Sequence, residues 1–92
     1  MNQNIIDAVR WYSGQELEVT RAAMYGYLEV GQKLPPHLQI IGQAASLVTL
    51  CEAIGLDTHD VLQIIQNMKA DLDAPFAHTI NAAKDYARGE LL

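Results

Sequence analysis

Hydrophobic residues recur at every third or fourth position along most of this chain, and glycine and proline fall between the periodic stretches. This spacing is typical of helices. A first helix is predicted over residues 4–12, and Ser13 with Glu16 has the spacing of a capping box for a second helix that ends near Gly31. We expect the wide apolar face of the second helix to pack against more than one neighbour. That face consists of Leu17, Val19, Ala23, Met24, Tyr27, Leu28 and Val30.

The third predicted helix is the most apolar. It begins at Pro35 and Pro36, because proline suits the first turn of a helix, and Gly55 is its expected left-handed stop. Apolar residues cover most of its circumference, so we expect this helix to lie at the centre of the fold. Small residues along the remaining strip permit close helix crossings, and these are Gly42, Ser46, Thr49 and Ala53.

Two further helices complete the prediction. Asp57 has the position of an N-cap for a helix that runs to about Lys69, and Pro75 opens a last helix that ends at Gly89. The inward residues of the fourth helix are predicted to be Val61, Leu62, Ile64, Ile65 and Met68. Those of the fifth are Phe76, Ile80, Ala83 and Ala87. Strand signals are absent, so the sequence predicts an all-α fold, a compact bundle of about five helices in a single domain over residues 1–92.

The composition indicates a folded chain with an apolar surface. Of the 92 residues, 50% are hydrophobic and 18% are charged, which disfavours disorder. We expect this apolar content to exceed what one small core can hide, so that the surplus lies on the surface as a subunit or partner interface. A homo-oligomer, most simply a dimer, is therefore expected.

Charge and cysteine content narrow the expected partners and compartment. The formal net charge is −5 and the six basic residues are scattered, so nucleic-acid binding is disfavoured. The single cysteine, Cys51, lies in an apolar run, which is typical of a reducing compartment. We recognise neither a secretory signal nor a stretch that is apolar over the length of a membrane span. The expectation is a cytoplasmic protein without a membrane partner.

Catalytic and metal sites need convergent polar groups, and the sequence offers none that we recognise. His37, His59 and His78 belong to three different predicted segments without the spacing of a metal-binding pair, and one cysteine cannot build a zinc site. The glycines lack the spacing of a phosphate-binding loop. We expect no enzymatic activity, no metal and no cofactor.

Four aromatic residues in the first third of the chain are candidates for a binding surface. Tryptophan and tyrosine are favoured at protein interfaces, although they also fill cores and subunit contacts. With two flanking arginines, the predicted partner-binding set is Trp11, Tyr12, Tyr25, Tyr27, Arg10 and Arg21. Within this set, Arg10, Tyr12 and Arg21 are also the candidates for recognising a small anionic ligand.

One stretch carries a family resemblance. It places the small residue Cys51 four positions before Gly55, puts Ile54 and Leu56 on either side of that glycine, and follows with the apolar residues Val61 and Ile64. With this pattern, residues 47–66 resemble the helix-turn-helix of bacterial and phage transcription regulators. The resemblance implies two helices that cross steeply around the glycine. It also implies outward, DNA-reading positions on the second helix, which are Thr58, His59, Asp60, Gln63 and Gln66.

The same stretch departs from the family in its charge. A DNA-reading helix usually brings arginine, lysine, asparagine or glutamine to the bases, whereas this helix opens with Asp57 and Asp60 and has no arginine. Any tight two-helix corner also needs a glycine between buried residues. The helix-turn-helix therefore ranks second as a functional interpretation.

These features rank three functions. The first is a non-enzymatic protein-interaction module, a self-associating small regulator or inhibitor that binds a larger partner protein. In size and charge the chain is similar to regulators and inhibitors encoded by phages and mobile elements. The second is a DNA-binding transcription regulator, and the third is a helical oligomer that binds a small anionic ligand between its subunits.

Overall fold

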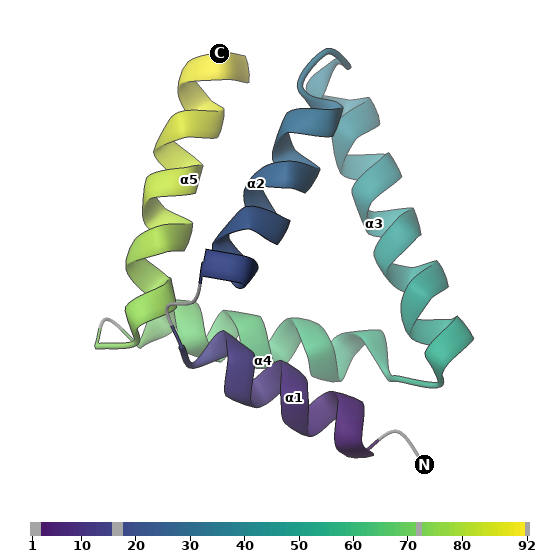
Figure 1. The fold of residues 1–92 in the computed structure, drawn as a ribbon. Helices are drawn as coiled ribbons and strands as arrows, with labels where there is room; N and C mark the ends of the chain where they lie inside the picture. The colour runs from purple at the N-terminus through teal and green to yellow at the C-terminus, as the bar shows by residue number, and fades with distance from the viewer. Residues whose placement is uncertain (1–2, 16–17, 72, 92) are drawn as a thin grey trace.

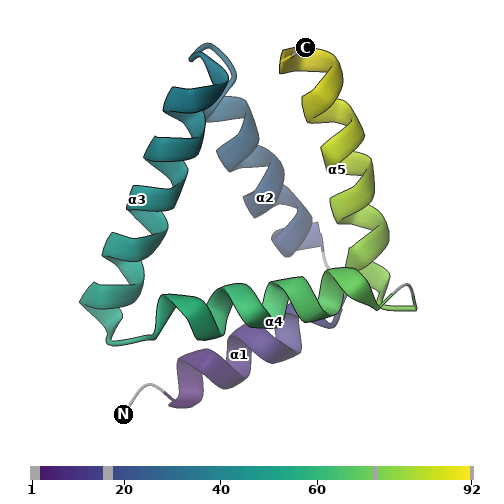
Figure 2. The same cartoon turned by 180° about the vertical axis from the view of Figure 1, so that it is seen from behind.

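The chain is all-α in a computed structural model that describes residues 3–15, 18–71 and 73–91, which confirms the predicted fold class. These residues form α1 (Gln3–Ser13), α2 (Glu18–Gly31), α3 (Pro36–Ile54), α4 (Thr58–Ala70) and α5 (Pro75–Leu91). Helices α1 and α4 lie side by side, and α2, α3 and α5 rise from them (Figure 1). From behind, α4 lies in front of α1, while α3 and α5 form the two sides of the molecule (Figure 2).

The predicted ends of α3 and α4 are confirmed because strong local signals fix them. Gly55 adopts the left-handed conformation, with φ 89° and ψ 29°. Its N–H and that of Leu56 both donate to the carbonyl oxygen of Cys51, at 2.8 and 2.7 Å, which stops α3 as in a Schellman motif. Two residues later, the carboxylate of Asp57 accepts a hydrogen bond from the N–H of His59 at 2.8 Å and so caps α4.

Two other predicted boundaries are wrong. Ser13 is the buried last residue of α1 rather than the cap of α2, and α1 ends at a turn in which the Gly14 N–H donates to the Arg10 and Trp11 carbonyls at 3.2 Å. Glu16, the other member of the predicted capping box, lies outside the described residues. Helix α5 continues past Gly89, because this glycine does not adopt the positive φ that would end a helix.

The core lies where α2, α4 and α5 meet. Met68 of α4 packs with Phe76 and Ala77 of α5, and these three side chains are 8%, 6% and 1% exposed. Partly buried residues surround them, namely Met24, Ile65, Ala74 and Ile80. The inward positions predicted for α5 are confirmed, since all four are buried or half-buried.

Helix α3 does not lie at the centre of the fold, so that prediction is wrong. Only Gln39 and Cys51 of its 19 residues are buried. The reason is that α3 is fastened at its two ends, by the turn to α2 and by α4, and diverges from α2 between them (Figure 1). The expected packing of the wide α2 face holds only in part. Met24 and Leu28 are half-buried and Met24 packs against the core, whereas the exposed residues of the face are Val19, Ala23, Tyr27 and Val30; Leu17 lies outside the described residues.

One glutamine closes the turn between α2 and α3. Gln39 is 7% exposed, and its Nε2 donates to the carbonyl oxygen of Leu34 at 2.8 Å. The same side chain lies against Gly31, where an added Cβ would meet it at 3.1 Å. A side chain at this position would require Gln39 to shift, so the glycine allows the two helices to approach closely here, and the helices separate beyond it.

Candidate interaction site

An apolar groove of about 950 Å³ lies between α2, α3 and α4, and we call it the α2–α3–α4 groove. Among the described residues that line it, none is charged. Its large apolar residues are Met24, Tyr27, Leu28, Val30, Leu34, Leu38, Leu47, Val48, Leu50 and Leu62. The groove exists because α3 is joined to α2 at one end and to α4 at the other, and the three helices enclose the space between.

The side chains of this groove are open to solvent. Val30 is 85% exposed and Tyr27 is 68% exposed, although both belong to the apolar face of α2. On α4, Leu62 is 42% exposed, so its predicted inward position is wrong, whereas the other four predicted residues of α4 are buried or half-buried. Leu62 lines the groove instead of a core because α3 does not close over it.

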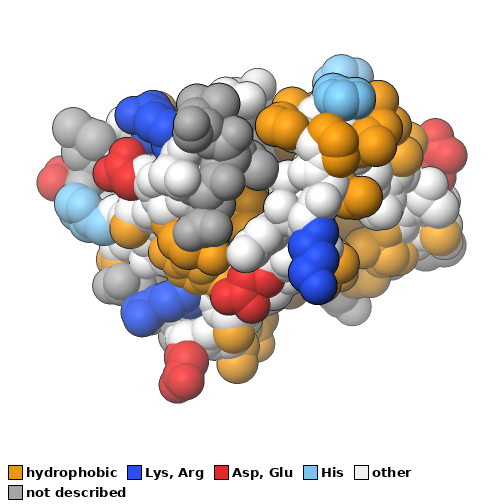
Figure 3. All heavy atoms as spheres, turned by 90° about the horizontal axis from the view of Figure 1, so that it is seen from above, with side chains coloured by type: hydrophobic (Ala, Val, Ile, Leu, Met, Phe, Trp, Pro, Cys, Tyr) orange, Lys and Arg blue, Asp and Glu red, His pale blue; other side chains and the backbone are white. Residues whose placement is uncertain are grey.

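Helix α3 is apolar on its outer side as well. Ile40 and Ile41 are 69% and 62% exposed and do not line the groove. Seen from above, hydrophobic side chains gather over the side of the molecule that carries α3 (Figure 3). The charged residue of this helix, Glu52, lies near its C-terminal end. Few residues of α3 are therefore suited to permanent contact with water.

The total surface is large for the mass of the chain. The accessible surface is 6583 Å² for 10.2 kDa. Folded monomers of this mass expose about 5,300 Å², so the excess is roughly 1,300 Å². Extended apolar patches on soluble proteins usually mark interaction surfaces. Exposed apolar residues of α2 and α3, such as Tyr27, Val30, Ile40 and Ile41, contribute to this surface.

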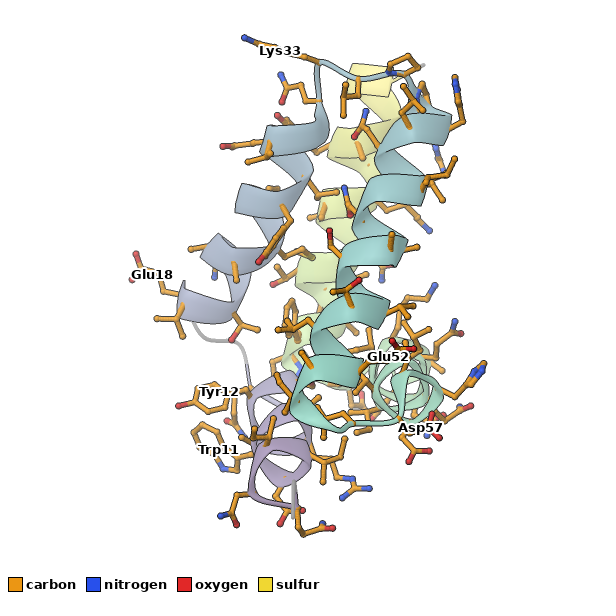
Figure 4. The ribbon with its side chains drawn as sticks, turned by 90° about the vertical axis from the view of Figure 1, so that its right-hand side faces the viewer. Trp11, Tyr12, Glu18, Lys33, Glu52 and Asp57 are labelled. Carbon is orange, nitrogen blue, oxygen red and sulfur yellow. The ribbon has the colours of Figure 1, made fainter. Side chains whose placement is uncertain are left out.

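The four aromatic residues predicted to bind a partner fall at three places. Trp11 and Tyr12 contact each other edge to face at the end of α1, with ring centroids 4.9 Å apart, and both project to the same side of the molecule (Figure 4). Tyr25 packs against Tyr86 of α5, with centroids 5.9 Å apart. Tyr27 lines the α2–α3–α4 groove. The sequence placed these residues close together, but the turn between α1 and α2 separates them.

The two arginines of the predicted set belong to different helices. Arg10 of α1 contacts Asp7 one turn earlier, with 3.4 Å between its Nη1 and the carboxylate oxygen. Both side chains are more than half exposed, so this ion pair contributes little to stability. Arg21 lies on α2. Recognition of a small anion by Arg10, Tyr12 and Arg21 stays a prediction.

The steep helix crossing implied by the helix-turn-helix resemblance is confirmed. The chain bends by 119° between α3 and α4. The expected anchors face inward, since Cys51 and Val61 are buried and Ile54, Leu56 and Ile64 are half-buried.

The positions predicted to read DNA lie on the outer side of this corner except for Thr58, whose predicted outward position is wrong. His59, Gln63 and Gln66 are exposed, while Thr58 is half-buried and lines the groove. The Nε2 of Gln63 donates to the Asn67 side chain at 2.8 Å. Acidic residues surround the corner, including Asp60 and the pair labelled in Figure 4, Glu52 and Asp57.

In the described ranges, no three His, Cys, Asp or Glu side chains come together in a way that could hold a metal ion. No single described helix combines the length and hydropathy needed to cross a membrane, and only the bent pair of α3 and α4 meets that criterion jointly.

The fold and the groove define a small all-α protein with an uncharged, solvent-open apolar groove. In comparisons with known proteins, no family model, curated protein or solved structure matches the chain. The groove is not predicted from the sequence. The apolar coverage around the whole of α3 is the signal that could have indicated it, since such a helix can be buried in its own chain or against another.

Proposed function

We propose that this chain is a non-enzymatic protein-interaction module, a small regulator or inhibitor that binds an apolar helix of another chain in the α2–α3–α4 groove. The observation that carries the proposal is the uncharged groove of about 950 Å³. Grooves between helices that accept an apolar helix are a recurrent mode of protein recognition. Pockets for small molecules usually add a few precisely placed polar groups. Here the buried polar side chain, Gln39, is already hydrogen-bonded within the chain.

The free energy available from covering this groove fits such a role. Burying one exposed valine, leucine or tyrosine-sized side chain contributes about 1.5–3 kcal/mol. Association costs about 4–15 kcal/mol in lost freedom of motion. Covering Tyr27, Val30, Leu34 and Leu62 together therefore contributes a free energy comparable with the cost of association. Neighbouring contacts add to this contribution and make binding favourable.

A second, smaller apolar surface supports the same function. Trp11 and Tyr12 are 57% and 46% exposed at the end of α1, and their rings contact only each other in the described aromatic pairs. Such residues often anchor interfaces, because they combine a large apolar area with a polar group. We assign them to contact with a larger partner protein, at a surface separate from the groove.

Replacing Leu62 by glutamate is expected to prevent groove binding. The probe is a fluorescein-labelled 18-residue amphipathic peptide of leucine, alanine and glutamine, followed by fluorescence anisotropy. Sedimentation velocity on the same samples reports whether the groove is already filled by another copy of the chain. We expect Leu62→Glu to reduce whichever association the wild type shows by about 100-fold, because an unpaired carboxylate would be buried.

Ala82 provides the matched control for this experiment. It is exposed on α5 and does not line the groove, so Ala82→Glu adds the same charge elsewhere and leaves association unchanged. A wild-type chain that is monomeric and does not bind the peptide would contradict the proposed function. Equal losses in the two variants would also contradict it, since they would indicate a general effect of charge.

The α3–α4 corner favours DNA binding as a second candidate function. Its support is the 119° bend and the inward position of the residues that anchor a helix-turn-helix. The exposed Gln63 and Gln66 are then the base-reading side chains. The acidic residues at the same corner place this candidate second, because phosphate contacts supply most of the affinity of such proteins.

If the chain binds DNA, replacing Gln63 and Gln66 by alanine is expected to reduce discrimination between target and random DNA by about 10-fold or more, in line with about 1–3 kcal/mol for each lost base contact. The measurement is fluorescence anisotropy with labelled genomic fragments and random-sequence duplexes over a salt series. Gln32→Ala, in the turn between α2 and α3 and remote from the α3–α4 corner, is the control. Absence of binding at low salt would rule out this candidate.

A further inference from the structure

We infer that the helix that occupies the α2–α3–α4 groove is α3 of a second copy of this chain, so that two copies form an antiparallel dimer with two-fold symmetry. The inference rests on the proposed function of the groove and names its occupant. In this dimer each α3 lies in the groove of the other copy, and the two grooves are filled reciprocally.

The area of exposed surface matches a dimer interface. The chain exposes 6583 Å², roughly 1,300 Å² more than a typical monomer of its mass. A stable protein–protein interface buries about 800 Å² on each partner, and permanent homodimers bury more. Burial of one α3 face and one groove on each copy would bring the surface per chain back to the ordinary range.

Charge favours α3 as the occupant of an uncharged groove. Among its 19 residues, Glu52 is the one Asp, Glu, Lys or Arg, whereas α1, α2, α4 and α5 each carry at least two such residues. Insertion of any of those helices would bury more charge without a partner. Helix α3 also matches the groove in length, because the groove is lined along α3 from Leu38 to Leu50.

Charge also selects the antiparallel direction. Lys33 lies at the end of the molecule where α2 turns into α3, and Glu52 and Asp57 lie at the opposite end of α3 (Figure 4). Antiparallel pairing places the basic end of each copy beside the acidic end of the other. Parallel pairing would place the two Glu52 carboxylates at the same level, where they repel each other.

The side chains of α3 complement themselves in this direction. The two-fold axis passes between Ala45 and Ser46. It places each residue of one α3 beside the residue of the partner's α3 that lies the same number of positions from the axis in the opposite direction along the sequence. The facing residues are small enough for close packing of the two helices. Leu38 lies opposite the partner's Ala53, and the central pairs join small residues, Gly42 with the partner's Thr49 and Ala45 with the partner's Ser46.

Gly42 is unexplained within one chain but has a reason in the dimer. A glycine in the interior of a helix is less favourable than alanine, and a Cβ added at Gly42 would meet nothing within 4 Å. By contrast, Gly31 contacts Gln39 within the chain. At Gly42 the missing side chain leaves room for the backbone of the partner's α3 to approach closely.

The first test is the oligomeric state of wild type, Ala45→Glu and Ala82→Glu by sedimentation velocity over a dilution series. Ala45 is exposed in the single chain, so the substitution is expected to leave the circular dichroism spectrum unchanged. In the dimer it places two carboxylates beside the axis, and dissociation should become easier by about 100-fold or more. Wild type and Ala82→Glu are expected at twice the 10.2 kDa chain mass.

A disulfide experiment tests the relative direction of the two α3 helices and does not depend on how tightly the variants associate. Chains carrying Leu38→Cys and chains carrying Ala53→Cys are mixed under mild oxidation, while the native Cys51 is buried. Antiparallel pairing predicts a disulfide between the two kinds of chain, and chains with Ala82→Cys should stay separate. Disulfides formed mainly between two Leu38→Cys chains would overturn the antiparallel arrangement.

The outcomes separate this inference from the proposed function. A wild-type chain that is monomeric but binds the amphipathic peptide overturns the dimer and supports the groove as a site for another protein. A monomer that binds no peptide overturns both. An Ala45→Glu variant that dimerises like the wild type shows that another surface mediates self-association.

Discussion

Replacing Phe76 by alanine is expected to lower the free energy of unfolding by about 3–5 kcal/mol. Phe76 is 6% exposed and packs with Met68 and Ala77 at the junction of α2, α4 and α5. Truncation removes apolar contacts and leaves a cavity that the neighbouring helices fill only in part. Domains of this size are stable by about 5–15 kcal/mol, so this single change would remove a large share of the stability.

The measurement is urea unfolding followed by circular dichroism, at a chain concentration where association does not contribute. Phe76→Leu keeps an apolar side chain in the site and is expected to cost less. Trp11→Ala removes an aromatic ring that is 57% exposed and lies outside both core and groove, with an expected loss below about 1 kcal/mol. If Phe76→Ala and Trp11→Ala cost the same, the core lies elsewhere than we describe.

Replacing Gly55 by alanine is expected to cost about 1–2 kcal/mol, because a side chain in the left-handed conformation meets the adjacent carbonyl oxygen. Gly55 has φ 89°, and its N–H donates to the carbonyl of Cys51 at the end of α3. The corner between α3 and α4 depends on this conformation. The loss should appear as a lower Tm and a lower urea midpoint.

Gly26 is the matched control for Gly55. It lies inside α2, and a Cβ added there would meet nothing within 4 Å. Gly26→Ala is therefore expected to stabilise the chain by up to about 1 kcal/mol through helix propensity. The two glycine-to-alanine changes should shift Tm in opposite directions, and equal shifts would refute the conformational explanation.

Dimerisation and DNA binding would use different surfaces of α3 and α4. A dimer formed through α3 leaves His59, Gln63 and Gln66 on the outer side of α4, where they are exposed in the single chain. Helix-turn-helix proteins commonly bind DNA as two-fold symmetric dimers with one reading helix in each half-site. If DNA binding were observed, the Ala45→Glu variant would therefore show whether it requires the dimer.

The candidate site could be predicted from the sequence only in part. The small residues of α3 and its low charge were visible, and they indicated close helix crossings. The groove was not predicted, because a helix that is apolar on all sides is compatible both with burial in its own chain and with burial against another. The predicted aromatic set failed to form one surface, because the turn after Ser13 sends α1 and α2 in different directions.

The helical class and the helix ends that depend on local chemistry can be predicted from the amino-acid sequence. Gly55 and Asp57 act on backbone groups a few residues away, so their effects do not require knowledge of the rest of the fold. Tertiary structure decided which apolar faces are covered. Leu62 and Met68 lie on the same helix, yet one is 42% exposed in the groove and the other is 8% exposed in the core. The difference arises because α5 packs against one end of α4, while α3 diverges from α2 and leaves the other end open.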